Sequence, residues 1–232
     1  MFRLRPRSGE TLYLKHGVDA VADDIATEAE RLSWLTGKLP APEIRAYHRD
    51  SDGALLVTTA LPGLTGDVWL ARESERLPMV VRAFAGFMLR LHAWPVEDCR
   101  FDASHPVRLA AARRNVAAGL VDEGDFDADH AGWSAAEMLA EVERLTPARA
   151  ERVVTHGDFS LGNLLVGEDG RVTGCIDVGR LGVADPYQDI AILWNNLEEF
   201  GAAAQRMLLD ELGIGEPDAR RLAFHRCLDE LF

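Results

Sequence analysis

The stretch HGDFSLGNLLVGEDGRVTGCID at residues 156–177 decides the fold of this chain. Its second half consists of two short apolar strands around the turn GEDG at residues 167–170, which predicts a β-hairpin. A hairpin brings its two ends together, so we expect Asp158, Asn163 and Asp177 to meet at one end of a small sheet.

These three side chains suit a magnesium-phosphate site. Mg²⁺ prefers oxygen ligands, takes one or two from protein carboxylates, and fills the remaining positions with phosphate oxygens and water. Asn163 and Asp177 can supply protein ligands, while Asp158 can orient an attacking hydroxyl and accept its proton. Each residue alone is typical of an ordinary turn. The ordered combination favours the catalytic interpretation, with His156 as a packing and hydrogen-bonding residue.

The first sixty residues predict a small antiparallel sheet with one helix. Alternating side chains at residues 2–15, around a turn at Ser8-Gly9, indicate a hairpin, and residues 43–60 indicate two further strands. Between them, residues 19–36 have helical periodicity and end at Gly37.

Glu28 lies on the apolar stripe of this helix, between Ile25 and Leu32. A carboxylate there needs a partner, because an isolated buried charge is costly, and Lys15 on the preceding strand is the candidate. In kinases a strand lysine paired with a helix glutamate holds the nucleotide phosphates. Taken singly, an exposed edge-strand lysine and a solvated helix glutamate are the commoner interpretations.

The remainder of the chain is predicted to be mainly helical. We expect an α+β fold with an amino-terminal nucleotide-binding lobe at residues 1–60, a hinge at 61–66, and a helical lobe at 67–232. Apolar periodicity indicates helices near residues 78–92, 106–119, 134–145, 185–199, 202–212 and 217–231. Asp185 and Asp189 are interpreted as structural residues that cap a helix and fix the catalytic loop.

Composition limits the function classes. The chain has 232 residues, is 47% hydrophobic and carries a formal net charge of −13. This acidic balance argues against a nucleic-acid partner and suits a cationic ligand. No stretch approaches the roughly 20 apolar residues of a membrane span, and the start lacks a secretory pattern, so we expect a cytoplasmic protein. We also expect a monomer or weak dimer. Three cysteines, Cys99, Cys175 and Cys227, are expected to be reduced, buried thiols.

The block at residues 153–191 closely resembles the aminoglycoside 3'-phosphotransferases. The resemblance extends over essentially the whole chain, through RLSWL at 31–35, LRLH at 89–92, AGLVD at 118–122 and LDELF at 228–232. It implies a protein-kinase-like fold, with ATP as phosphoryl donor and Mg²⁺ as cofactor. It also implies that Asp158 is the catalytic aspartate and that Asn163 and Asp177 hold the magnesium.

The resemblance assigns a substrate role to the carboxyl terminus. Asp229 and Glu230 lie at a helix carboxyl end, where negative charge opposes the helix dipole by about 0.3–1 kcal/mol each. The resemblance implies that they bind ammonium groups of the aminoglycoside together with the free carboxylate of Phe232, and that Arg180 lies near substrate or phosphate. The alternative is that Asp229 and Glu230 form the solvated side of an amphipathic helix.

Two departures from the family pattern stand out. Relatives carry roughly thirty more residues before the equivalent of Phe2, and a sheet without its first strand has an unpaired edge and fewer backbone donors for the phosphates. We therefore expect either that the true start lies upstream of Met1 or that this is a shortened form with weakened ATP binding. Well-known members also have an Arg-Asp pair where this chain has Asn195 and Asn196, which removes one negative charge beside a polycationic ligand.

The expected reaction is magnesium-assisted transfer of the γ-phosphoryl group of ATP to the 3'-hydroxyl of a kanamycin- or neomycin-like aminoglycoside, which would confer antibiotic resistance. A related kinase for choline, homoserine or a macrolide is the alternative within the class. A truncated, inactive remnant is the alternative outside it. Joint retention of the Lys15–Glu28 pair and the three residues of the magnesium site argues against the remnant.

Overall fold

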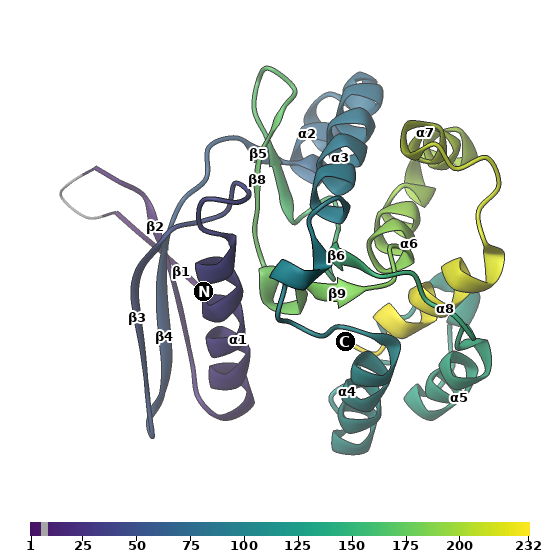
Figure 1. Ribbon diagram of the computed structural model, residues 1–232, viewed down its shortest axis with the longest axis horizontal. Coiled ribbons are helices and arrows are strands. Elements are labelled where there is room, and N and C mark those ends of the chain that lie inside the picture. The colour runs from purple at the N-terminus through teal and green to yellow at the C-terminus, as the bar shows by residue number, and fades with distance from the viewer. Residues whose placement is uncertain (6–8) are drawn as a thin grey trace. The chain divides into compact units, whose positions relative to one another are not determined.

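The computed structural model describes residues 1–5 and 9–232, and Figure 1 traces its course. The chain divides into two compact units. The first unit consists of residues 1–87 and 161–181, and the second of residues 88–160 and 182–232.

A four-stranded antiparallel sheet forms the beginning of the first unit. Its strands are β1 (Phe2–Leu4), β2 (Leu12–Gly17), β3 (Ile44–Asp50) and β4 (Gly53–Thr59), in the order β1-β2-β4-β3. The predicted amino-terminal hairpin and the two strands of residues 43–60 are confirmed. The turn expected at Ser8 lies outside the described residues. In this register Lys15, on β2, pairs with Leu56 on β4.

Helix α1 (Asp19–Leu35) packs against this sheet and covers one face of it (Figure 1). Its buried residues recur at the three- and four-residue spacing of a helix face, which explains why this segment is helical and which side it buries. They are Ala22, Ile25, Glu28, Ala29, Leu32 and Leu35. One of the six is a carboxylate, so the packing face of α1 carries a charge that the sheet side has to neutralise.

The rest of the first unit surrounds the predicted hairpin. Strands β7 (Leu164–Val166) and β8 (Val172–Cys175) form that hairpin, and β5 (Leu64–Thr65) adds a third antiparallel strand. Helix α2 (Gly66–Arg72), the 3₁₀ turns η1 (Ser74–Arg76) and η4 (Val178–Arg180), and the first part of α3 (Leu77–His92) complete it. The predicted helix near 78–92 is confirmed, and the boundary between the units falls inside it.

Residues 61–66, predicted to be a hinge, contain β5 and the start of α2. Gly66 is required there by close packing. A Cβ at this position would lie 2.7 Å from the Phe84 ring and 3.1 Å from the carbonyl oxygen of Leu161. The division into lobes at residues 61–66 stays a prediction.

The second unit is mainly helical. It contains α4 (His105–Ala118), α5 (Ala135–Leu145), α6 (Tyr187–Asn196), α7 (Ala202–Leu212) and α8 (Ala219–Asp229). Short 3₁₀ turns η2 (Val96–Asp98), η3 (Ala128–His130) and η5 (Glu198–Phe200) connect them, and β6 (Val153–Thr155) pairs with β9 (Gly182–Ala184). The five predicted helices of this region are confirmed. Strand β9 was not predicted.

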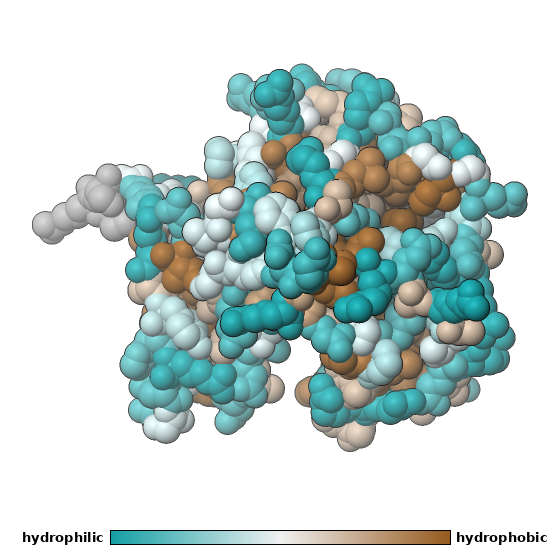
Figure 2. All heavy atoms as spheres, viewed as in Figure 1, coloured by the Kyte–Doolittle hydropathy of each residue, from teal (hydrophilic) through white to brown (hydrophobic). Residues whose placement is uncertain are grey.

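A hydrophobic core holds α4, α5 and α8 together, and its largest fully buried members are Met138, Phe224, Leu228 and Leu231. All three cysteines are free and buried, as predicted. Figure 2 shows hydrophilic side chains over much of the face in view, in keeping with the net charge of −13. Across residues 1–5 and 9–232, no helix has the length and apolarity needed to cross a membrane.

Candidate active site

The predicted contact between Lys15 and Glu28 is present in the first unit. The ammonium group of Lys15, from β2, donates to both carboxylate oxygens of Glu28, from α1, at 2.8 and 2.7 Å. The Glu28 side chain is only 12% exposed, so the pair neutralises the one carboxylate on the packing face of α1.

Lys15 also donates to Oδ1 of Asp177, which lies 162 positions away in the sequence. Asp177 follows β8 and has φ 54° and ψ 47°. This is a left-handed backbone conformation that residues other than glycine rarely adopt. Such conformations persist where the surrounding structure enforces them, and they are common at functional sites. One ammonium group therefore contacts two carboxylates from two separate elements.

Burial and charge act in opposite directions on this cluster. Burial by itself lowers the pKa of Lys15, but attraction to Glu28 and hydrogen bonding to Asp177 outweigh it, so the pKa is raised and the ammonium stays charged. Burial raises the pKa of Glu28, Lys15 opposes that shift, and Asp177 adds to it. With both carboxylates ionised, the cluster carries one excess negative charge. That excess suits a bound cation.

Asn163 and Asp177 lie at the same end of the β7–β8 hairpin. The backbone N–H of Ile176, the residue before Asp177, donates to the backbone carbonyl of Asn163 at 2.9 Å. The predicted convergence of these two residues is confirmed. An amide oxygen and a half-exposed carboxylate are hard oxygen donors, so this donor set fits Mg²⁺.

The loop that carries Asp158 belongs to the second unit and is fixed by a buried carboxylate. Asp189, from α6, accepts the backbone N–H groups of His156 and Gly157 at 2.9 Å each, and His92 Nε2 lies 3.0 Å from it. The backbone N–H of Asp158 donates to His156 Nδ1 at 3.3 Å. The predicted structural roles of Asp189 and His156 are confirmed. The approach of Asp158 to the magnesium ligands stays a prediction.

Acidic residues gather where α8 ends. Glu230 lies just beyond α8, its side chain is 10% exposed, and its Oε1 accepts the backbone N–H of Asp127 at 3.0 Å. Burial raises the pKa of Glu230 to about 7, with repulsion from Asp127 and Asp229 adding to the shift. Glu230 is therefore not part of a solvated helix face, and Asp229 is half-buried.

Sequence reasoning missed Asp127, which joins this acidic group from the loop before α5. Asn195 Nδ2 donates to one carboxylate oxygen of Asp127 at 3.2 Å, and Arg226 donates to the other at 3.2 Å. Nothing in the local pattern around Asp127 distinguishes it from its acidic neighbours. Phe232 is half-buried, and the guanidinium of Arg108 lies 3.8 Å from the centre of its ring.

Arg180 lies in η4, three residues after Asp177. Burial and the neighbouring Asp23 raise the pKa of Asp24 on α1, while the charge of Arg180 lowers it. Arg180 is thus within electrostatic reach of the start of α1. Its predicted position at substrate or phosphate stays a prediction.

Comparison with known proteins places this geometry in a family. Residues 1–225 match the model of the phosphotransferase enzyme family, APH. The chain belongs to this family. An aminoglycoside 3'-phosphotransferase of Escherichia coli is 46% identical over 233 residues, which cover 100% of this chain and 86% of that relative.

Solved structures of the family have the same fold. The crystal structure of an aminoglycoside 3'-phosphotransferase of type VIII matches with a TM-score of 0.91 at 38% identity, covering 99% of this chain and 88% of that one. The aminoglycoside phosphotransferase APH(3'')-Id from Streptomyces rimosus, in complex with ADP and streptomycin, matches with a TM-score of 0.86 at 29% identity, covering 98% and 88%. The predicted protein-kinase-like α+β fold is confirmed, and the chain is a phosphotransferase.

Proposed function

We propose that this phosphotransferase moves the γ-phosphoryl group of ATP to the 3'-hydroxyl of an aminoglycoside, and that the modified antibiotic no longer acts. The observation that carries the proposal is the Lys15 ammonium held between Glu28 and Asp177. This chain is 46% identical to an aminoglycoside 3'-phosphotransferase. In the proposed reaction, Lys15 supplies the cation that binds phosphate, and Asp177 supplies one magnesium ligand.

Lys15 binds the α- and β-phosphates, and Glu28 holds the lysine in place. Asn163 and Asp177 would hold Mg²⁺, which when bound neutralises phosphate charge as the γ-phosphoryl group leaves. Lys15 then exchanges its contact with Asp177 for the nucleotide while keeping Glu28. Mg²⁺ held by Asn163 and Asp177 would offset the excess negative charge of Glu28 and Asp177.

Asp158 orients the acceptor. It accepts a hydrogen bond from the 3'-hydroxyl and takes its proton as the oxygen–phosphorus bond forms and the bond to the β-phosphate breaks, releasing ADP. The transition state is loose, so the protein contributes mainly alignment and charge stabilisation. The anchoring of His156 and Gly157 by Asp189 keeps the catalytic carboxylate in position.

The acidic carboxyl terminus gathers the antibiotic. Asp229 and Glu230 bind ammonium groups of the drug, with Phe232 beside them, and Arg180 lies at the phosphate side. Crowding of Asp127, Asp229 and Glu230 supports this assignment, because their mutual repulsion is relieved when a polycation binds. The enzyme is expected to act in the cytoplasm as a monomer or weak dimer.

A second regiochemistry has a specific observation behind it. The structural relative with bound streptomycin carries a 3'' designation, so phosphorylation at a 3''-hydroxyl is the competing possibility. The 46% identity to a 3' enzyme favours the 3'-hydroxyl.

A substrate panel tests the proposal. Purified protein is incubated with Mg-ATP and kanamycin, neomycin, streptomycin, choline or a macrolide, and phosphorus NMR identifies the modified hydroxyl. We expect a 3'-phosphate on kanamycin, with the rate reduced by at least about 10³-fold in Asp158→Ala although ATP still binds. Phosphate on streptomycin alone, or on choline or a macrolide alone, would refute the substrate assignment. Undiminished turnover in Asp158→Ala would refute the role of the aspartate.

A further inference from the structure

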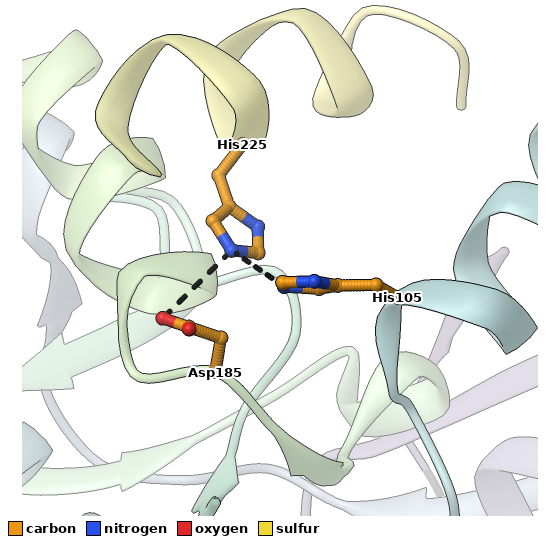
Figure 3. A group of neighbouring side chains, drawn as sticks. All are labelled: His105, Asp185 and His225. Atoms are coloured by element: carbon orange, nitrogen blue, oxygen red, sulfur yellow. Dashed lines mark hydrogen bonds and ion pairs between the residues drawn. The ribbon is translucent and has the colours of Figure 1, made fainter. Parts of the chain in front are cut away.

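Two histidines and an aspartate meet in the interior of the second unit, and none of the three is assigned above to substrate or nucleotide. His105 begins α4, Asp185 lies between β9 and α6, and His225 lies in α8 (Figure 3). They are 6%, 1% and 1% exposed. Three segments far apart in sequence therefore bring metal-ligating side chains together in a buried place.

The spacing of the donor atoms is that of a metal site. His105 Nε2 and His225 Nε2 are 3.3 Å apart, and His225 Nε2 is 3.9 Å from Asp185 Oδ1. Two imidazole nitrogens bound to one tetrahedral Zn²⁺ at about 2.0–2.1 Å lie about 3.3 Å from each other. The pair of nitrogens is already at ligand spacing, and one donor atom of each of the three residues lies within 4.8 Å of the others.

The hydrogen bonds of His225 indicate which of its ring nitrogens could coordinate a metal. Gln188 Nε2 donates to the carbonyl of Gly157 at 3.4 Å, which directs its Oε1 toward His225 Nδ1 at 3.2 Å. An amide oxygen only accepts, so Nδ1 of His225 carries the proton and Nε2 presents a lone pair. A ring nitrogen held by such a hydrogen bond, with the other nitrogen free to coordinate, is the usual arrangement around metal-ligating histidines.

One carboxylate oxygen of Asp185 could coordinate a metal ion. Its Oδ1 accepts from Arg221 at 2.6 Å and from the backbone N–H of Tyr187, the first residue of α6, at 2.9 Å, although the N-cap position of this helix is Pro186. Its Oδ2 is buried and has no hydrogen-bond partner among residues 1–5 and 9–232. A buried, unsatisfied carboxylate oxygen is costly. If His105 and His225 only formed a hydrogen bond with each other, the Asp185 Oδ2 atom would remain without a partner.

The charges around the site are partly compensated. Arg221 is neutralised by Asp185 and by Glu151, whose Oε1 lies 3.1 Å from it, and the Arg108 guanidinium stacks on the Phe232 ring. Burial lowers the pKa values of His105 and His225, and Arg221 adds to the shift in both, whereas Asp185 opposes the shift in His105.

We propose that His105, Asp185 and His225 form a buried structural site for a borderline transition-metal cation, with Zn²⁺ as the ion that fits best. Two imidazoles and one carboxylate suit Zn²⁺, whereas Mg²⁺ and Ca²⁺ prefer oxygen ligands only. On binding, the His105 proton moves to its other ring nitrogen, so that both Nε2 atoms coordinate while Asp185 turns Oδ2 to the ion. The ion ties α8 and α4 to the segment before α6, and through Gln188 to the backbone of the catalytic loop.

Zinc titration of the full-length chain tests this site without using its activity. Protein treated with EDTA and dialysed is titrated with ZnCl₂ by calorimetry, and bound zinc is counted by mass spectrometry. We expect one Zn²⁺ per chain and a rise in Tm of about 5 °C at saturating metal. His105→Gln and His225→Gln should each lose stoichiometric binding and the Tm rise.

Two matched histidine variants serve as controls. His48→Gln removes an exposed histidine beside Asp50, and His130→Gln removes the histidine whose Nε2 lies 3.7 Å from Cys227 Sγ. Both should bind zinc as the wild type does. Loss of binding in His130→Gln, with binding retained in His105→Gln, would place the metal elsewhere and overturn the proposal.

A measurement on the wild type alone guards against variants that fail to fold. Co²⁺ bound by two imidazoles and a carboxylate gives the visible absorption of a tetrahedral site without a thiolate charge-transfer band. That spectrum supports the proposal. A thiolate band, or substoichiometric zinc uptake by the wild type, contradicts it.

Discussion

At the scale of single residues, the site depends on one cation shared by two acids. Lys15 holds Glu28 through both oxygens and reaches Asp177, so each partner loses its compensation when the lysine is removed. The buried glutamate is the more sensitive of the two, because burial already raises its pKa. Lys15 therefore stabilises the packing of α1, and in the proposed reaction it also binds the nucleotide.

Replacing Lys15 with alanine should impair both nucleotide binding and the packing of α1. We expect KM for ATP to rise and kcat to fall, with kcat/KM reduced by about 10²-fold or more, because the phosphates lose their cation. Initial-rate kinetics with kanamycin saturating measure this. Lys38→Ala is the matched control, since the Lys38 ammonium donates to the backbone carbonyl of Trp34 and lies over the Trp34 ring. Equal losses in the two variants would argue against a specific role for Lys15.

The raised pKa of Glu230 predicts a pH dependence of stability. The folded-state pKa of about 7 lies above the ordinary value of 4.5, so its contribution to stability is fully present below pH 4.5 and is lost as pH rises through 7. Glutamine cannot ionise. Relative to Glu230→Gln, the wild type should therefore lose about 1–3 kcal/mol of unfolding free energy between pH 5 and 8.

Urea unfolding of both proteins across this pH range measures the difference. Glu168→Gln, in the exposed turn between β7 and β8, is the control and should track the wild type. If the gap between wild type and Glu230→Gln does not change with pH, Glu230 is not the titrating group.

At the scale of elements, helix α5 shows how a short sequence signal fixes a boundary. Ser134 and Glu137 form a capping box, in which the Ser134 hydroxyl accepts the Glu137 backbone N–H at 3.3 Å and Glu137 accepts the Ser134 backbone N–H at 2.9 Å. The helix buries Met138 and Val142 completely in the core with α8. Its start therefore fixes the register of a packed face.

Ser134→Ala should destabilise the protein by about 1 kcal/mol, because a helix-terminal N–H loses its acceptor. The unfolding midpoint in urea should fall with an unchanged m-value, and kcat should stay as in the wild type. Ser51→Ala, in the exposed β3–β4 turn, is the control and should have little effect. A loss of activity larger than the loss of stability would mean that α5 contributes directly to catalysis.

At the scale of the whole molecule, the net charge of −13 matches a polycationic substrate and opposes a polyanionic one. The long-range part of this field is screened by salt. Local contacts between carboxylates and ammonium groups remain, so salt should weaken the attraction of the drug without abolishing its binding.

We expect KM for kanamycin to rise several-fold when KCl is increased from about 20 mM to about 200 mM, since the Debye length shortens over that range. KM for ATP, measured in the same series, is the internal control and should stay level or fall, because the same field repels the nucleotide. A KM for kanamycin that is independent of salt would mean that local contacts alone attract the drug.

The sequence by itself determined much of this protein. Alternating and helical periodicities predicted the β1–β2 hairpin, α1 and the β7–β8 hairpin, because local burial patterns follow from residue spacing. The position of Glu28 on an apolar stripe predicted its pairing with Lys15, because a buried carboxylate requires a cation. Asn163 and Asp177 were brought together by the geometry of a hairpin, which is also local.

The tertiary structure alone decided the contacts that join distant segments. Strand β9 was not predicted, and it is a strand because β6, which lies far from it in the sequence, pairs with it. The hydrogen bond from Lys15 to Asp177 joins residues 162 positions apart in the sequence. The contact between Asp127 and Glu230 joins residues 103 positions apart. The meeting of His105, Asp185 and His225 is of the same kind. Residue spacing does not encode such contacts, because the positions of these side chains are determined only when whole helices and strands pack together.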